Sequence, residues 1–248
     1  MTALVRSELL KVRTVRSWWA YLIVIVALAA LATAGEIGPS DQPRSTLEFQ
    51  VGLVDAGGIA ALIAIILGIT VVTAEFRHGT ITPTTLVEPH RERVAAAKAV
   101  AVGLLAVVFA ALSLAVIAAV AAIWLPLVDA DVHLLDGEAL ERAAQVVLLA
   151  VLWALLGLAI GFVVHSQVAA LVGTLVWIFL GEALIAALLG LVDADGVASY
   201  LPFQALDAAD GTGGADFLRY WPGVAVSAGW IAAVGAAGLV RTGRRDIT

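Results

Sequence analysis

The sequence predicts an all-α integral membrane protein with six transmembrane helices. The first observation is composition: 62% of the 248 residues are hydrophobic and 14% are charged, which lies far outside the range of soluble domains. The second is that the hydrophobic residues gather in six stretches, each about long enough to cross a hydrocarbon core about 30 Å thick as a helix. These spans are expected at 18–34, 57–74, 99–124, 143–164, 168–192 and 222–240.

The distribution of lysine and arginine predicts how the spans are oriented. With the N-terminus in the cytoplasm, 11 of the 14 basic residues lie on the cytoplasmic side and 3 lie outside. This is the asymmetry of the positive-inside rule, and the inverse orientation would reverse it. Both ends of the chain are therefore expected in the cytoplasm. The three outer basic residues are Arg44, Arg142 and Arg219.

An amphipathic helix is expected at residues 2–17, before the first span. Apolar residues such as Leu9 recur there at helical spacing, while Lys11, Arg13 and Arg16 lie largely off this stripe. Two tryptophans follow at the start of the span. A basic amphipathic helix that ends in tryptophans is expected to lie along the inner leaflet, in contact with lipid. An ordinary cytoplasmic extension of the first span is the alternative.

The first span, 18–34, is expected to be retained in the protein. Ala32-Thr33-Ala34 has the small residues of a signal-peptidase site and follows a basic segment. The hydrophobic stretch is, however, longer than that of a usual signal peptide. We therefore interpret it as a transmembrane helix.

The segment 75–93 is the one sizeable cytoplasmic loop in this orientation. Thr82 before Pro83 is typical of a helix start, because threonine caps a helix and proline is favoured at its first position. Pro89 would end such a helix. The sequence therefore predicts a short helix at 83–88 between two turns. Two interpretations of this segment are a solvated hairpin that merely joins two spans and a docking site for another protein. Composition alone favours the hairpin.

The connection 193–221 is expected to lie outside and to re-enter the membrane in part. Residues 200–206 are apolar, whereas the glycines and aspartates of 207–216 predict a flexible turn. Irregular backbone is tolerated at membrane depth only where it is buried in protein or lines a cavity. A re-entrant element would therefore pack against the other spans.

Small residues predict where spans approach one another closely. Gly157 and Gly161 form a G-x-x-x-G pattern in the fourth span, and Gly235 and Gly238, with two alanines, thin one side of the sixth. Such faces let helix backbones pack at short distance.

Glu182 is the one carboxylate well inside a predicted span, the fifth. An ionised carboxylate there is costly, so the side chain should be protonated, hydrogen-bonded or facing water. Two interpretations stay open. One is a polar contact in a pathway across the membrane. The other is a neutral glutamic acid that hydrogen-bonds to a neighbouring helix or to 193–221.

Motifs for catalysis and for ATP binding are absent from the sequence. The loops are too short to hold a soluble catalytic domain, and the four histidines lack metal-ligand spacing. No serine has G-x-S-x-G context, and neither Lys11 nor Lys98 follows a glycine as a P-loop requires. With no cysteine there is no thiolate nucleophile. We expect no metal site and no nucleic-acid partner, and any ATP must be hydrolysed by another subunit.

Several short patterns occur in order along the chain. The most specific is Glu75-Phe76-Arg77-His78-Gly79-Thr80, after the second span. The others are Ser7-Glu8-Leu9-Leu10-Lys11, Arg16-Ser17-Trp18-Trp19, Arg91 with Ala97-Lys98, Glu182 and Leu201-Pro202-Phe203. Together they resemble the permease subunits of ABC-2 transporters. The chain is similar to the small bacterial type rather than to larger forms fused to a nucleotide-binding domain.

The resemblance implies a permease of a bacterial cell membrane that has no ATPase site of its own. Family members pair two six-span subunits, here as a homodimer or a heterodimer, and bind two copies of a cytoplasmic ATPase that holds ATP and magnesium. By this resemblance the helix at 2–17 contacts the ATPases, and 193–221 caps the pathway from outside. The segment 75–93 becomes the coupling segment, in place of a simple hairpin. Its residues are Glu75, Phe76, Arg77, Gly79, Thr80, Pro83 and Leu86.

A proton-coupled secondary transporter that uses Glu182 is the alternative to such an ATP-driven exporter. Three spans followed by three in the opposite orientation is the arrangement of an inverted repeat. The loops argue against it, because 35–56 would have to match the three residues of 165–167, and 75–93 has no counterpart in the second half. An intramembrane enzyme is a third alternative, which the absent motifs disfavour. The transported substrate stays open.

Overall fold

The computed structural model describes residues 1–14, 17–38, 43–78, 90–211 and 218–243, and the regular secondary structure in these ranges is helical. Six stretches are long and apolar enough to cross a membrane, which confirms the predicted fold class. They are α2 (Ser17–Ile37), α4 (Ile59–His78) with the helices before it, α6 (Arg91–Leu127), α7 (Gly137–Val164), α8 (Gln167–Val176) with its continuation, and α12 (Tyr220–Gly243).

Shorter helices complete the chain. α1 (Thr2–Thr14) precedes the first span, and α3 (Leu47–Asp55) leads into α4 through the 3-10 turn η1 (Ala56–Gly58). In the fifth span, α8 continues through the π-helical turn η2 (Trp177–Gly181) into α9 (Glu182–Gly190). Two further helices, α10 (Asp195–Ala198) and α11 (Pro202–Asp210), separate α9 from α12.

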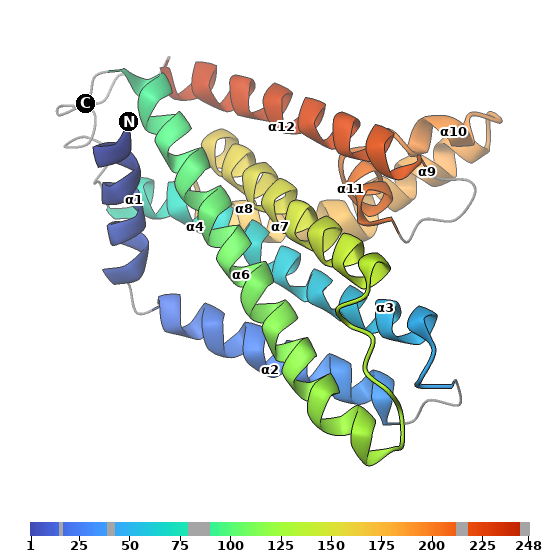
Figure 1. The fold of residues 1–248 in the computed structure, drawn as a ribbon. Helices are drawn as coiled ribbons and strands as arrows, with labels where there is room; N and C mark the ends of the chain where they lie inside the picture. Colours follow the sequence, from blue (N-terminus) through green and yellow to red (C-terminus); the bar gives the residue numbers. More distant parts are fainter. Residues whose placement is uncertain (15–16, 39–42, 79–89, 212–217, 244–248) are drawn as a thin grey trace.

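The two ends of the bundle differ in charge. At one end α1 crosses near the last turn of α4 and the first turns of α6, and α12 also finishes there (Figure 1). We call it the basic end, because it carries Arg6, Arg13, Arg77, Arg93 and Arg241. At the other end lie α3, α10 and α11 (Figure 1). We call it the acidic end, because it carries Asp55, Glu138, Asp193, Asp207 and Asp210.

The core lies between α4 and α7. Of the most apolar stretch in each span, 61% is buried in the span of α4 and 67% in α7, against 17% in the fifth span and in α12. Glycine makes this close packing feasible. A Cβ on Gly68 would lie 2.1 Å from the carbonyl oxygen of Ala154, and one on Gly157 would lie 2.3 Å from that of Ile65.

Two of the other predicted small-residue contacts, at Gly161 and Gly238, are close as well, whereas a Cβ on Gly235 would lie 3.9 Å from the Cβ of Ala159, an ordinary contact. A Cβ on Gly161 would lie 3.1 Å from the carbonyl oxygen of Ile69, in α4. On the side of α7 that faces α12, a Cβ on Gly238 of α12 would lie 2.6 Å from the Cβ of Phe162. α7 is therefore the central helix, with α4 on one side and α12 on the other.

Substitution of Gly157 by alanine is expected to destabilise the bundle by about 1–3 kcal/mol, since the added methyl group meets backbone that cannot move aside locally. The matched control is Gly173→Ala in α8, where a Cβ meets no atom within 4 Å. SDS-induced unfolding in detergent micelles, followed by circular dichroism, measures both. Equal unfolding midpoints for the two variants would contradict the close contact.

Several helices extend beyond the predicted bounds. The third span runs from Arg91 to Leu127 rather than over 99–124, and the outer connection 35–56 contains α3. Hydropathy marks only the part of a helix that faces hydrocarbon, whereas backbone hydrogen bonding continues through polar turns. For the same reason Glu75, Phe76 and Arg77 form the last turn of α4 instead of a loop.

Some predicted features fall outside the described residues. The predicted helix at 83–88 lies there, as do Gly79, Thr80, Pro83 and Leu86 of the coupling segment. Arg16 of the N-terminal helix lies there too, and the described part of that helix is α1, which ends at Thr14.

Candidate functional site

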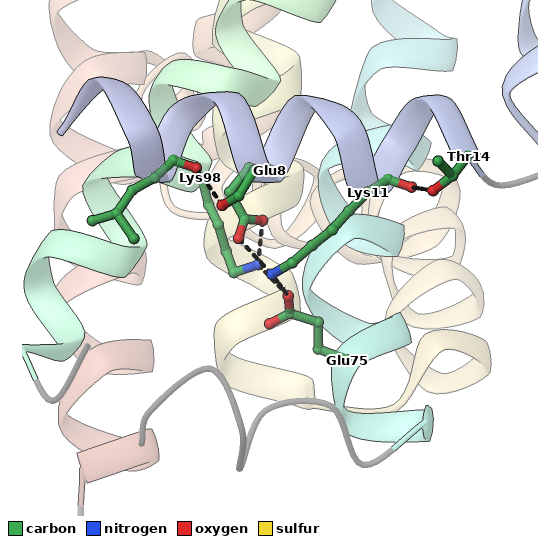
Figure 2. A network of polar contacts seen from close by, with 7 residues as sticks. Glu8, Lys11, Thr14, Glu75 and Lys98 are labelled. Carbon is green, nitrogen blue, oxygen red and sulfur yellow. Dashed lines mark hydrogen bonds and ion pairs between the residues drawn. The ribbon is translucent and has the colours of Figure 1, made fainter. Parts of the chain in front are cut away.

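Four charged side chains from three helices meet at the basic end. We call Glu8 and Lys11 of α1, Glu75 of α4 and Lys98 of α6 the charge cluster (Figure 2). The Nζ atom of Lys98 lies 2.6 Å from Oε2 of Glu8 and 2.7 Å from Oε1 of Glu75. The Nζ atom of Lys11 lies 2.6 Å from Oε1 of Glu8 and 2.8 Å from Oε1 of Glu75. Each ammonium group therefore bridges both carboxylates.

Burial makes these contacts matter. The side chain of Lys98 is 2% exposed, and those of Glu8 and Glu75 are 5% and 9% exposed, whereas Lys11 is 43% exposed. Charges removed from water are tolerated only when they are paired and hydrogen-bonded, and here two positive and two negative charges alternate. Burial lowers the pKa of Lys11, but the hydrogen bonds to Glu75 and Glu8, together with the negative charges of these two carboxylates, outweigh it and raise the pKa above its ordinary value. The cluster thus fixes α1 to α4 and α6.

The sequence placed these residues in separate features. The sequence predicts Lys11 in the interface helix and Glu75 in the coupling segment. Glu8 and Lys98 occur only in the short patterns that carry the family resemblance. One feature of the sequence indicates that Glu8 and Lys98 each need a partner. Glu8 lies within the apolar stripe of α1, and Lys98 lies at the start of a long apolar helix. Two opposite charges on surfaces that should be buried each need a partner.

Phe76 contacts a different part of the bundle. Its ring packs edge-on against the ring of His165, with centroids 4.2 Å apart. His165 ends α7, and its Nε2 lies 3.0 Å from the hydroxyl oxygen of Thr242 in α12. Arg77, the next residue of the predicted coupling segment, is exposed. Leu9 of the N-terminal helix packs against the main core, and Arg13 is exposed.

At the acidic end, Glu182 caps the helix α11. The residue is 2% exposed, and its Oε1 accepts hydrogen bonds from Nε1 of Trp177 at 3.0 Å and from the backbone N–H of Phe203 at 2.8 Å. Its Oε2 accepts from the backbone N–H of Gln204 at 2.9 Å. First-turn N–H groups have no acceptor within their own helix and carry partial positive charge. The carboxylate therefore satisfies two of them, within the segment 193–221.

Local backbone geometry directs Glu182 toward α11. The π-helical turn Trp177–Gly181 immediately precedes it in the fifth span, and such turns occur frequently at functional sites. Gly181 leaves room for the indole ring, because a Cβ there would lie 2.9 Å from Cε3 of Trp177. No pattern in the sequence indicated this turn.

A buried arginine holds the other end of α11. Arg142 of α7 is 8% exposed, and its Nη2 lies 3.0 Å from Oδ1 of Asp210. It also donates to the backbone carbonyl of Asp210 and to the carboxylate of Asp55, at the end of α3. A cation near the last carbonyl groups of a helix is favourable. Opposite charges thus hold the two ends of α11, although the sequence offered Arg142 only as one of three outer arginines.

The surroundings of Asp207 raise the pKa of its carboxyl group. It lies on the exposed side of α11, outside the six candidate spans, yet neighbouring protein removes part of its hydration. This partial burial raises the pKa of Asp207, and the negative charges of Asp210 and Glu182 raise it further, to about 6. Below that pH, α11 therefore carries one negative charge fewer than its sequence indicates.

Comparison with known proteins identifies the family. A search among curated proteins found no match. A family model described as ABC-2 family transporter protein matches residues 4–181 of the 248, which is well over half of the chain. The match includes the whole charge cluster and ends one residue before Glu182, and it confirms the resemblance found in the sequence. The chain therefore belongs to the ABC-2 family of transporter proteins and is a membrane permease of that type.

Proposed function

We propose that this permease is the membrane-spanning subunit of an ATP-driven exporter. Two copies of the chain would form the substrate pathway and bind two copies of a separate cytoplasmic ATPase, which supplies the ATP and magnesium sites. The basic end would face the cytoplasm, in agreement with the positive-inside rule. The coupling segment would run from Glu75 to Arg93 and would include the predicted docking helix at 83–88.

The charge cluster is the observation that carries this proposal. α4 ends at His78, three residues after Glu75, and α6 begins at Arg91, seven residues before Lys98. Glu75 and Lys98, on either side of the segment between these two helices, are 2.7 Å apart and are joined to α1 through Glu8 and Lys11. A push on the segment would therefore move three helices together, as rigid-body transmission requires.

The geometry of Glu182 favours an ATP-driven exporter over a proton-coupled transporter. A coupling carboxylate has to take up and release protons and to face a water-filled route. The carboxylate of Glu182 is instead 2% exposed, and three N–H donors occupy it. Two of these donors belong to the backbone of α11, so they cannot be withdrawn unless the helix moves.

The assembly can be tested directly. The permease is coexpressed with a candidate ATPase subunit, purified in detergent, and examined by mass photometry and by ATP turnover. We expect a complex of two permeases and two ATPases whose turnover exceeds that of the ATPase alone. A stable permease monomer that never retains an ATPase would overturn the proposal.

The same preparation tests the coupling segment. Arg77→Ala and Gly79→Val are each expected to lower the permease-dependent stimulation of ATP turnover by roughly 5-fold or more, the size of a typical coupling free energy. Membrane insertion should be unchanged. The matched control is Arg241→Ala, at the end of α12 on the same side of the bundle. Undiminished stimulation in both test variants would leave 75–93 as a simple connection between two spans.

A further inference from the structure

Two adjacent residues at the end of α4 contact opposite halves of the bundle. Successive residues of a helix point about 100° apart, so Glu75 and Phe76 address different neighbours. Glu75 is held by α1 and α6 through the charge cluster. Phe76 packs on His165, which stands between α7 and α8. The start of the predicted coupling segment is thus joined to α1 and α6 and to the turn between α7 and α8 by separate contacts.

The backbone of His165 has an unusual conformation. Its φ of 59° lies in the left-handed region at the end of α7, where its N–H donates to the carbonyl of Gly161 at 3.1 Å. Glycine is the residue that most often ends a helix this way, because a side chain is disfavoured there. The imidazole ring supplies contacts that glycine could not make, which accounts for a histidine at a conformationally costly position.

The ring of His165 connects α4 to the last span. The hydroxyl group of Thr242 donates its proton to the carbonyl of Gly238 at 2.9 Å. Its oxygen can then accept, at 3.0 Å, from Nε2 of His165 in the tautomer that carries the hydrogen on that atom. α12 is in turn pressed against α7, since a Cβ on Gly238 would lie 2.6 Å from the Cβ of Phe162. Movement of the ring cannot leave α7 and α12 unaffected.

We infer that His165 is a positioning residue that transmits displacement of the coupling segment, through Phe76, to the fourth, fifth and sixth spans. The charge cluster joins α1, α4 and α6 in the same way. This inference rests on the proposed ATP-driven function. It adds a second route for transmitting the displacement, separate from the route through the charge cluster. Coupling of this kind requires contiguous contacts between the two sites and an element with two arrangements, whose equilibrium both sites can shift.

The test uses distances at the acidic end, far from His165. The sequence has no cysteine, so label sites can be introduced without removing any. One pair of spin labels reports on the first half, at Leu31→Cys in α2 and Ile123→Cys in α6, each 69% exposed. The other reports on the second half, at Leu140→Cys in α7 and Trp221→Cys in α12, 53% and 70% exposed.

Distances are measured by double electron–electron resonance on the permease–ATPase complex in nanodiscs, with and without ATP and vanadate. In the native sequence we expect both pairs to shift on addition of ATP and vanadate. In His165→Phe and in Thr242→Val, the first-half pair should keep its shift, while the second-half pair should lose roughly half of it or more. Thr242→Ser, which retains the hydroxyl acceptor, should restore the shift, and His133→Phe at the acidic end serves as the control.

The outcomes separate this inference from the proposed function. If neither pair shifts in the native complex, the ATP-driven function fails, and the inference fails with it. If the native complex responds but both test variants keep the full second-half shift, His165 transmits nothing and only the inference is overturned. Equal loss in both pairs would also overturn it, because His165 would then support the fold as a whole.

Discussion

Replacing Lys98 by methionine is expected to destabilise the permease by about 3–5 kcal/mol, the cost of removing one partner from a buried ion pair. The ammonium group of Lys98 bridges Glu8 and Glu75, and its side chain is 2% exposed. Without it, two buried carboxylates share Lys11 alone. Methionine fills a similar volume, so the loss reflects charge rather than a cavity. SDS-induced unfolding gives the free energy of the change.

A double variant separates charge imbalance from general damage. Lys98→Met combined with Glu8→Gln removes one charge of each sign and leaves the pair of Lys11 and Glu75, whose atoms are 2.8 Å apart. Its destabilisation should fall below the sum of the two single variants by about 0.5–3 kcal/mol, as for residues in direct contact. Arg6→Met, on the exposed side of α1, is the control. If Lys98→Met were as stable as that control, the buried cluster would be refuted.

Replacing Glu182 by leucine is expected to release α11. Three N–H donors, from Trp177, Phe203 and Gln204, would lose their acceptor. A buried donor left unpaired costs about 1–3 kcal/mol, and the N–H of Phe203 is such a donor. Glutamine can keep one oxygen beside Trp177 and Phe203, but its amide group would face the N–H of Gln204. We therefore expect Glu182→Gln to be tolerated far better than Glu182→Leu, in unfolding by SDS and in ATP turnover of the complex.

The control for Glu182 is Glu138→Leu, an exposed carboxylate in the first turn of α7. Equal stability of Glu182→Leu and this control would rule out the capping role. A second measurement addresses proton coupling, with a pH-sensitive dye inside vesicles that hold the permease. Proton uptake driven by an imposed pH gradient without ATP, and lost in Glu182→Gln, would favour the secondary transporter over the ATP-driven exporter.

Hydropathy alone was enough to predict the fold class and the six spans. A stretch that must lie in hydrocarbon needs apolar side chains along its whole length, so the signal is local and can be read residue by residue. The glycines of the fourth span were predictable for a related reason, since small residues are needed wherever two backbones approach closely. Helix ends were less predictable. α4 continues through a polar turn to His78, and α6 begins with a polar turn at Arg91.

The partners of the buried charges were decided only by the tertiary structure. Glu8 and Lys98 are 90 residues apart in the sequence, and Glu182 is 21 residues from Phe203. Hydropathy indicates that each charge needs a partner, but the partner depends on which helix faces overlap and on a π-helical turn that only the folded backbone shows. The same holds for His165, whose place between Phe76 and Thr242 depends on how α4, α7 and α12 pack.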